Sequence, residues 1–88
     1  MTKAIARKGN FFVYIVRCTH GTLYTGYTND LDKRFKMHNS GKGAKYLRGK
    51  GPVRLVWSKE YRYYKNAIKA ENRIKRMTKK QKEQLVGP

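Results

Sequence analysis

The chain has 88 residues, of which 39% are hydrophobic and 12% aromatic, and its 22 lysines and arginines against five acids give a formal net charge of +17. This length predicts one domain with a modest core, the single Cys18 excludes an intramolecular disulfide, and the lack of a long apolar run excludes a membrane-spanning helix. A cationic surplus of this size predicts a polyanionic partner, DNA or RNA, bound through counterion release.

The first ten residues, 1–10, are predicted to be a flexible basic tail. They lack the apolar segment of a secretory signal, so we expect a cytoplasmic protein. Residues 11–86 are predicted to form a single domain, because no internal repeat or linker interrupts them.

Two strands are predicted next, over residues 11–18 and 22–28. The first is a continuous apolar run typical of a strand buried on both faces, and the second is rich in Tyr and Thr. Residues 19–21 between them suit a three-residue hairpin loop, in which Gly21 takes the left-handed conformation.

This loop length fixes the register of the hairpin, because centring the turn on His20 pairs Val16 with Tyr24 and Tyr14 with Gly26. Tyr14 and Tyr24 then lie on one face as diagonal neighbours, about 7–8 Å apart at Cα, and Gly26 leaves an opening beside the Tyr14 ring. A two-residue loop would put the two phenols on opposite faces. Taken singly, either tyrosine can be an ordinary strand aromatic.

A helix is predicted over residues 30–39, with Leu31 and Phe35 as its buried anchors. Arg34 and His38 lie on the margin of the same stripe, so both can point toward the sheet. The alternatives are a solvated cation at position 34 and a histidine that caps or packs near the helix end.

Residues 41–52 form a Gly-rich basic segment that lacks the spacing of a P-loop. Its glycines and cations suit a loop that follows a nucleic-acid backbone, and its tyrosine suits stacking on a base. An ordinary solvated connection is the alternative. The candidate nucleic-acid-binding residues are Lys42, Lys45, Tyr46, Arg48 and Lys50.

The rest of the chain predicts a third strand over residues 53–61, with Leu55 and Trp57 on one face. A helix follows that begins at residue 64 or 66 and ends at residue 77, and a short last helix opens with a capping box at Thr78. This order of elements, β-β-α-β-α-α, predicts an α+β (α/β) fold with a three-stranded, mainly antiparallel sheet flanked by helices.

Glu71 is the only acid in a helical segment otherwise filled with Lys and Arg. It can pair with Lys75 one turn later, which would stabilise the helix by a few tenths of a kcal/mol. However, Glu71 lies between Ala67 and Ile74, on the inward side of the predicted helix. A buried carboxylate without a role is costly, so this position favours a functional one.

These residues resemble the motifs of the GIY-YIG nuclease superfamily. The triplet Phe12-Val13-Tyr14 stands where the first motif would be, and Tyr24-Thr25-Gly26 stands where the second would be. Arg34, His38 and Glu71 match the later motif positions in type and spacing, and the joint spacing is more specific than any single motif. The resemblance covers nearly the whole chain and is greatest to the small stand-alone bacterial branch.

The resemblance implies a metal-dependent endonuclease that hydrolyses DNA phosphodiester bonds, with structure-selective cleavage in repair or recombination as one expectation. In that scheme a tyrosine hydroxyl, Tyr14 with Tyr24 beside it, takes a proton from the attacking water. Glu71 holds one Mg²⁺ or Mn²⁺ ion, and Arg34 neutralises charge on the phosphoryl group. His38 accepts a proton or orients a phosphate. Because free tyrosine is a poor base at neutral pH, we expect the cationic surroundings to lower the tyrosine pKa.

The chain departs from the family pattern at two places. Tyr27 follows the second motif where several relatives carry a lysine, and no asparagine stands where many members have one after the metal-binding glutamate. Gln81 or Gln84 are the candidate substitutes for that asparagine. Larger relatives also carry a separate DNA-binding domain, so we expect targeting to come from this chain's own charge or from a protein partner.

Two other functions compete with cleavage. The first is a non-catalytic basic module that binds nucleic acid through a vestigial site. The second, binding to a membrane surface, is disfavoured because no predicted helix has a large exposed apolar face. We expect a monomer, with DNA as the partner and RNA as a further candidate.

Overall fold

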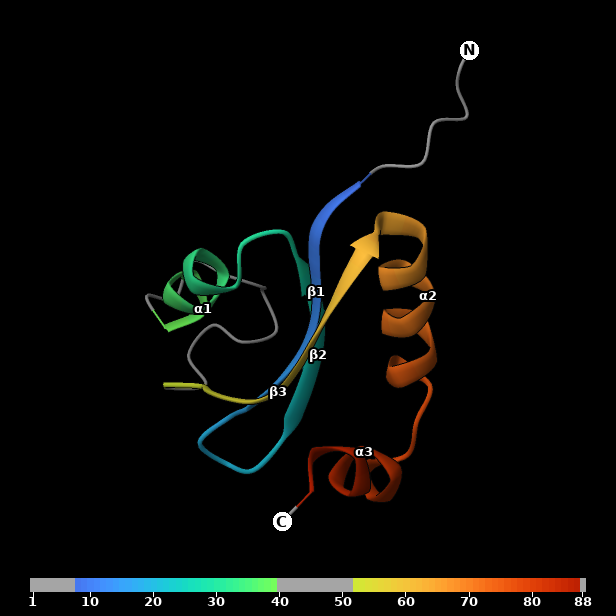
Figure 1. Ribbon diagram of the computed structural model, residues 1–88. Coiled ribbons are helices and arrows are strands. Elements are labelled where there is room, and N and C mark those ends of the chain that lie inside the picture. The colour runs from blue at the N-terminus through green and yellow to red at the C-terminus, as the bar shows by residue number, and fades with distance from the viewer. Residues whose placement is uncertain (1–7, 40–51, 88) are drawn as a thin grey trace.

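The structure is a computed structural model that describes residues 8–39 and 52–87, without the side chains of Lys8 and His38. Within these residues no helix has the length and apolar character needed to cross a membrane. The chain folds in the predicted order β-β-α-β-α-α (Figure 1). The elements are β1 (Lys8–Arg17), β2 (Leu23–Thr28), α1 (Leu31–Asn39), β3 (Arg54–Tyr63), α2 (Tyr64–Lys75) and α3 (Lys79–Val86).

The three strands form one antiparallel sheet in the order β2-β1-β3, which confirms the predicted α+β fold. This strand order explains the continuous apolar run of β1. As the central strand, β1 is covered on both faces, and it contributes Phe11, Val13, Tyr14, Ile15 and Val16 to the buried core.

The hairpin between β1 and β2 has the predicted register, with Val16 opposite Tyr24 and Tyr14 opposite Gly26. Gly21 has a φ of 87°, the left-handed conformation that the short turn requires. The turn is closed by a hydrogen bond of 2.8 Å from the Gly21 amide to the Cys18 carbonyl. Tyr14 and Tyr24 therefore lie on the same face of the sheet.

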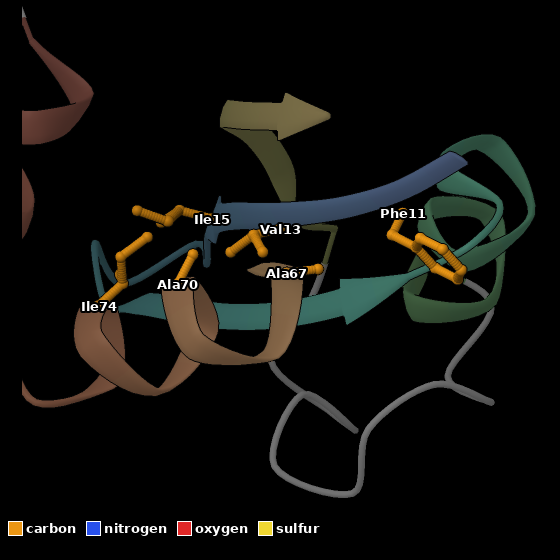
Figure 2. Close-up of a cluster of buried hydrophobic side chains, with 6 residues drawn as sticks. All are labelled: Phe11, Val13, Ile15, Ala67, Ala70 and Ile74. Carbon is orange, nitrogen blue, oxygen red and sulfur yellow. The ribbon is translucent and has the colours of Figure 1, made fainter. Parts of the chain in front are cut away.

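The sheet separates two hydrophobic clusters, because α1 and α2 lie on opposite sides of it (Figure 1). Figure 2 shows the cluster on the α2 side, where the odd-numbered residues of β1 meet Ala67, Ala70 and Ile74. The cluster on the other side contains Tyr14 and Val16, with Leu31 and Phe35 of α1 packed against them. Leu31 and Phe35 are thus the anchors that the sequence predicted.

The third strand differs from its predicted pattern, which placed Leu55 and Trp57 on one face. The register of β3 against β1 shifts between Ile15 and Val16, so that Trp57 lies opposite Ile15 while Leu55 lies opposite Val16. Trp57 packs with the α2-side cluster, whereas Leu55 borders the α1 side. A bulge inserts one extra residue and breaks the alternation, and sequence spacing does not reveal it.

The element boundaries also differ from the predicted ones. β1 begins at Lys8 rather than at residue 11, because Lys8 pairs with Tyr63 near the end of the sheet. Residues 8–10 are therefore strand and not part of the predicted tail, and the rest of that tail lies outside the described residues. β3 continues to Tyr63 and α2 follows at once, with no side chain capping its first turn.

The last helix begins with the predicted capping box. The Gln81 amide donates to Thr78 Oγ1 at 3.2 Å, and the Thr78 amide donates to Gln81 Oε1 at 2.9 Å. A bidentate ion pair then ties α3 to the sheet: Arg17 Nη1 and Nη2 donate to the two carboxylate oxygens of Glu83 at 2.9 and 2.7 Å. This geometry holds both side chains by two parallel hydrogen bonds.

We expect Glu83→Gln to lower the melting temperature at neutral pH, because it removes the charge from this ion pair. The hydrogen bonds from Arg17 hold the pKa of Glu83 below its usual value. The stabilisation is therefore present above the unfolded carboxyl pKa of about 4.3 and is lost as the pH falls through the lower folded value. Thermal denaturation between neutral and acid pH measures it, and the two proteins should converge at the acid end. A constant gap at all pH values would contradict this role.

Candidate active site

The hydroxyl end of Tyr14 lies directly over Gly26 of the neighbouring strand. A Cβ atom at position 26 would stand 2.5 Å from Tyr14 Cζ and 3.0 Å from Cε2, which is too close for any side chain. Tyr14 is 3% exposed, so its ring has little room to move aside. Glycine at position 26 is thus the condition for the phenol of the central strand to reach across the edge strand β2.

Three of the predicted site residues lie near enough to Tyr14 to act on its pKa. Burial of the phenol is the largest cause and raises the pKa, and Tyr24 beside it raises it further. Arg34 acts in the opposite direction and lowers it, while the negative charge of Glu71 raises it. Charges on residues of β2, α1 and α2 thus act on the pKa of this one hydroxyl of β1.

This result corrects the expectation that the cationic surroundings lower the pKa of Tyr14. The pKa is raised above the ordinary value of 10.0, because the cost of burying a phenolate exceeds the attraction of Arg34. Most of the chain's positive charge lies on exposed side chains, where water screens it. In the free protein, Tyr14 is therefore a neutral phenol at neutral pH.

Arg34 reaches the site from the first turn of α1. This helix begins where the sequence predicted, because Asp30 Oδ1 accepts a hydrogen bond of 3.1 Å from the Lys33 amide and caps the first turn. Arg34 and Tyr14 line one small pocket, whose other walls are apolar and include Phe35 and Leu55. Leu55 is 39% exposed, the one large hydrophobic side chain among the described residues that is exposed.

Leu55 is a site-lining residue that sequence reasoning missed. In a regular strand Leu55 would lie on the same face as Trp57. The bulge in β3 instead turns Leu55 toward Tyr14. Thr25 faces the other side of the sheet, opposite Ile15, and its buried hydroxyl has no hydrogen-bond partner among the described residues.

The structure agrees with both sequence-based interpretations of Glu71, an inward position on its helix and an ion pair with Lys75. Its side chain is 14% exposed, as the inward position predicted, and its Oε2 lies 3.1 Å from Lys75 Nζ, as the spacing of one turn also predicted. The ammonium is half exposed. The carboxylate is thus largely withdrawn from water, yet its ionic partner sits on a flexible side chain at the surface.

The donor set around Glu71 restricts the metal that could bind there. Among the described residues no three His, Cys, Asp or Glu side chains gather, so a closed structural zinc site does not fit. A single carboxylate does fit a hard cation such as Mg²⁺ or Mn²⁺, since such ions keep several waters and take one or two carboxylates plus phosphate oxygens.

The remaining predicted residues are placed only in part. His38 falls within α1, but its side chain lies outside the described residues. The five candidate nucleic-acid-binding residues Lys42, Lys45, Tyr46, Arg48 and Lys50 also lie outside them. Gln81 is engaged in the capping box of α3, so it is not the substitute for the missing asparagine.

Replacing Gly26 tests the close approach of Tyr14. We expect Gly26→Ala to lower the free energy of unfolding by about 1–3 kcal/mol, because the added methyl overlaps a buried ring. Gly9→Ala is the matched control, since its Cβ would lie 3.4 Å from the Phe11 ring, an ordinary contact. Urea denaturation measures both variants, and equal losses would show that Tyr14 does not depend on Gly26.

The raised pKa of Tyr14 predicts how the tyrosines titrate. Tyr14 should ionise at a higher pH than a free tyrosine, and Tyr14→Phe should remove this late step from the phenolate absorbance curve. The neutral phenol stabilises the folded state below the unfolded pKa of about 10, and this contribution is lost as the pH rises through the folded value. Stability should therefore fall less steeply above pH 10 in Tyr14→Phe. An unchanged titration curve would contradict the burial of this hydroxyl.

The comparisons with known proteins identify the family of the chain. Residues 10–84 match the family model of the GIY-YIG catalytic domain, a domain that points to nuclease activity with DNA as substrate. The chain is 49% identical over 78 residues to UPF0213 protein BH0048 of Halalkalibacterium halodurans, covering 89% of this chain and 83% of that protein. It is 53% identical over 77 residues to a UPF0213 protein of Cronobacter sakazakii, covering 88% and 81%. These names state no activity.

Two solution NMR structures have the same fold. The structure of BH0048 from Bacillus halodurans is similar with a TM-score of 0.60 and 48% identity, covering 90% of this chain and 88% of that one. The structure of EF2693 from E. faecalis is similar with a TM-score of 0.63 and 37% identity, covering 93% and 88%. With the family model matched over most of the chain, these likenesses show that the protein belongs to the GIY-YIG family.

Proposed function

We propose that the protein is a metal-dependent endonuclease that hydrolyses phosphodiester bonds in DNA. The observation that supports this most is that Arg34 and Tyr14 line one pocket, while Tyr24, Arg34 and Glu71 all act on the pKa of the Tyr14 hydroxyl. Two phenols, a guanidinium and a partly buried carboxylate supply a donor, a cation for the phosphate and an anchor for a metal. The net charge of +17 supports a polyanionic substrate.

In this proposal Arg34 binds the scissile phosphate. A guanidinium donates two parallel hydrogen bonds to phosphate oxygens, and its charge stabilises the negative charge that grows there during the displacement. The side chains that border Arg34 beside Tyr14 are apolar, and they strengthen this attraction by lowering the local dielectric constant.

Tyr14 acts as a hydrogen-bond donor rather than as the base. Because burial raises its pKa, it keeps its proton at neutral pH and can hold the attacking water or a phosphate oxygen in place. The proton from the water then passes to His38, or to Tyr24 in its phenolate form. The cleavage rates of His38→Ala and Tyr24→Phe separate these two.

Glu71 would hold the metal together with water molecules and a phosphate oxygen. A bound Mg²⁺ or Mn²⁺ ion supplies Lewis-acid stabilisation of the leaving oxygen. Lys75 would move from the carboxylate toward solvent, which its half-exposed side chain allows.

One observation favours a different function, a non-catalytic module that binds nucleic acid. The ion pair between Glu71 and Lys75 satisfies the carboxylate without a metal. Binding alone predicts a steep dependence of affinity on salt, no need for a divalent ion, and no loss of affinity in Glu71→Gln.

A cleavage assay separates the two functions. Wild-type protein is incubated with Mg²⁺ or Mn²⁺ and a panel of single-stranded, nicked, flapped and branched DNA, which also tests whether cleavage is structure-selective. We expect Tyr14→Phe, Arg34→Ala and Glu71→Gln each to lower the rate by about a hundred- to a thousand-fold, as the loss of one preorganised group at a transition state does. Affinity for DNA should survive.

The controls distinguish catalysis from folding and from charge. Lys33→Ala removes an exposed cation next to Arg34 in the sequence and should leave the rate nearly unchanged. Chelation of divalent ions by EDTA should abolish cleavage by the wild-type protein. Cleavage that persists in Glu71→Gln, or an absence of cleavage on every substrate with tight binding retained, would overturn the proposal in favour of the binding module.

A further inference from the structure

Positive charge is unevenly distributed over the described residues. The α2–α3 layer, residues 64–86, has eight lysines and arginines against two acids, whereas residues 30–39 around α1 have three against two. Both acids of the α2–α3 layer are engaged: Glu71 pairs with Lys75, and Glu83 pairs with Arg17 of β1. The surplus cations of this layer therefore have no acidic partner among the described residues.

Part of this charge forms a straight line on α2. Lys65, Lys69, Asn72 and Arg76 follow one another at intervals of four, three and four residues, and all are exposed. This spacing places them on one face of the helix, opposite the buried stripe of Ala67, Ala70 and Ile74. Arg76 keeps helical dihedral angles although α2 ends at Lys75. We call these four residues the outer ridge of α2.

Helix stability does not account for this arrangement. Lys65 lies in the first turn of α2, where the helix dipole favours negative charge, and that turn has no acid and no side-chain cap. Lys65 and Lys69 also repel each other at a spacing of four residues. The same conflict recurs in α3, whose first two residues are Lys79 and Lys80. Charges placed against local stability indicate a ligand that compensates them.

A phosphate backbone is the ligand whose charge matches the ridge. From Lys65 to Arg76 the helix rises by about 16 Å, which is long enough to contact more than one phosphate of a strand. Asn72 adds a neutral donor within the line, as phosphate contacts often use. A membrane surface fits poorly, because the exposed large hydrophobic residue among the described residues, Leu55, lies on the other side of the sheet.

We propose that the outer ridge of α2 binds the backbone of the DNA strand that leads into the active site, an inference that rests on the proposed endonuclease function. Glu71 lies on the flank of the same helix, between the ridge and the buried stripe, so DNA with a phosphate at the carboxylate has the ridge beside it.

The test compares the triple variant Lys65→Gln, Lys69→Gln, Arg76→Gln with a control of equal charge change, Lys33→Gln, Lys36→Gln, Lys59→Gln, which alters exposed cations on α1 and β3. Fluorescence anisotropy of a labelled DNA duplex in EDTA gives the affinity at several salt concentrations. Each phosphate contact contributes about 0.9 to the slope of log K against log salt. We expect this slope to become shallower by about 2–3 in the ridge variant and by less than about 1 in the control variant.

Thermal denaturation adds a readout that does not depend on DNA binding. Because the ridge cations oppose helix stability, the ridge variant should melt at the same or a higher temperature than the wild type at low salt. A variant that melts lower and binds weakly would overturn the claim that these charges are retained for a ligand. Equal slopes for the ridge and control variants would overturn the binding surface, as would a stronger effect of the ridge variant on binding to anionic phospholipid vesicles.

The same variants separate this inference from the proposed function. If the wild type cleaves no DNA while the salt dependence of DNA affinity is still weaker in the ridge variant, the endonuclease proposal fails. The ridge is then a nucleic-acid contact without cleavage. If the wild type cleaves and the ridge variant keeps both its slope and its KM, the ridge fails and the endonuclease stands. In a cleaving protein we expect the ridge variant to raise KM with little change in kcat.

Discussion

The site depends on one steric constraint, the passage of the Tyr14 phenol over Gly26. The three-residue turn sets the register that puts these two residues opposite each other, and the absent side chain lets a residue of the central strand extend over the edge strand. A slip of one residue in this hairpin would turn Tyr14 and Tyr24 to opposite faces. Two glycines thus determine the position of the Tyr14 phenol, since Gly21 allows the turn and Gly26 allows the approach.

Around this phenol, burial has a greater effect than charge. The protein has a large cationic surplus, but most of it stands in water, where it acts weakly on a buried hydroxyl. Among the described residues, the guanidinium that acts on Tyr14 is that of Arg34, and its effect is smaller than that of desolvation. In the proposed mechanism this balance keeps Tyr14 protonated as a donor and leaves proton transfer to another group. The surface charge then serves the encounter with nucleic acid and its alignment.

The residues of the candidate site come from helices on both sides of the sheet. Arg34 belongs to α1, and Glu71 belongs to α2, which also has a line of exposed cations. α3 is tied to β1 by the Arg17–Glu83 pair, so the second basic helix keeps a fixed place beside the sheet. For a chain of this size, which buries a modest core, such a pair is a local substitute for apolar contact.

The sequence by itself determined the order of elements, the antiparallel hairpin with its register, the capping box of α3 and the inward position of Glu71. Each of these follows from local rules: loop length, side-chain alternation, capping residues and helical periodicity. The tertiary structure alone decided the side of Leu55, because a bulge depends on the pairing of β3 with β1. It also decided the ionisation of Tyr14 and the partner of Glu83. The pKa depends on how deeply neighbouring elements bury the ring, and the Arg17–Glu83 pair joins residues 66 apart in the chain. Local sequence patterns contain neither the depth of burial of Tyr14 nor this long-range pairing.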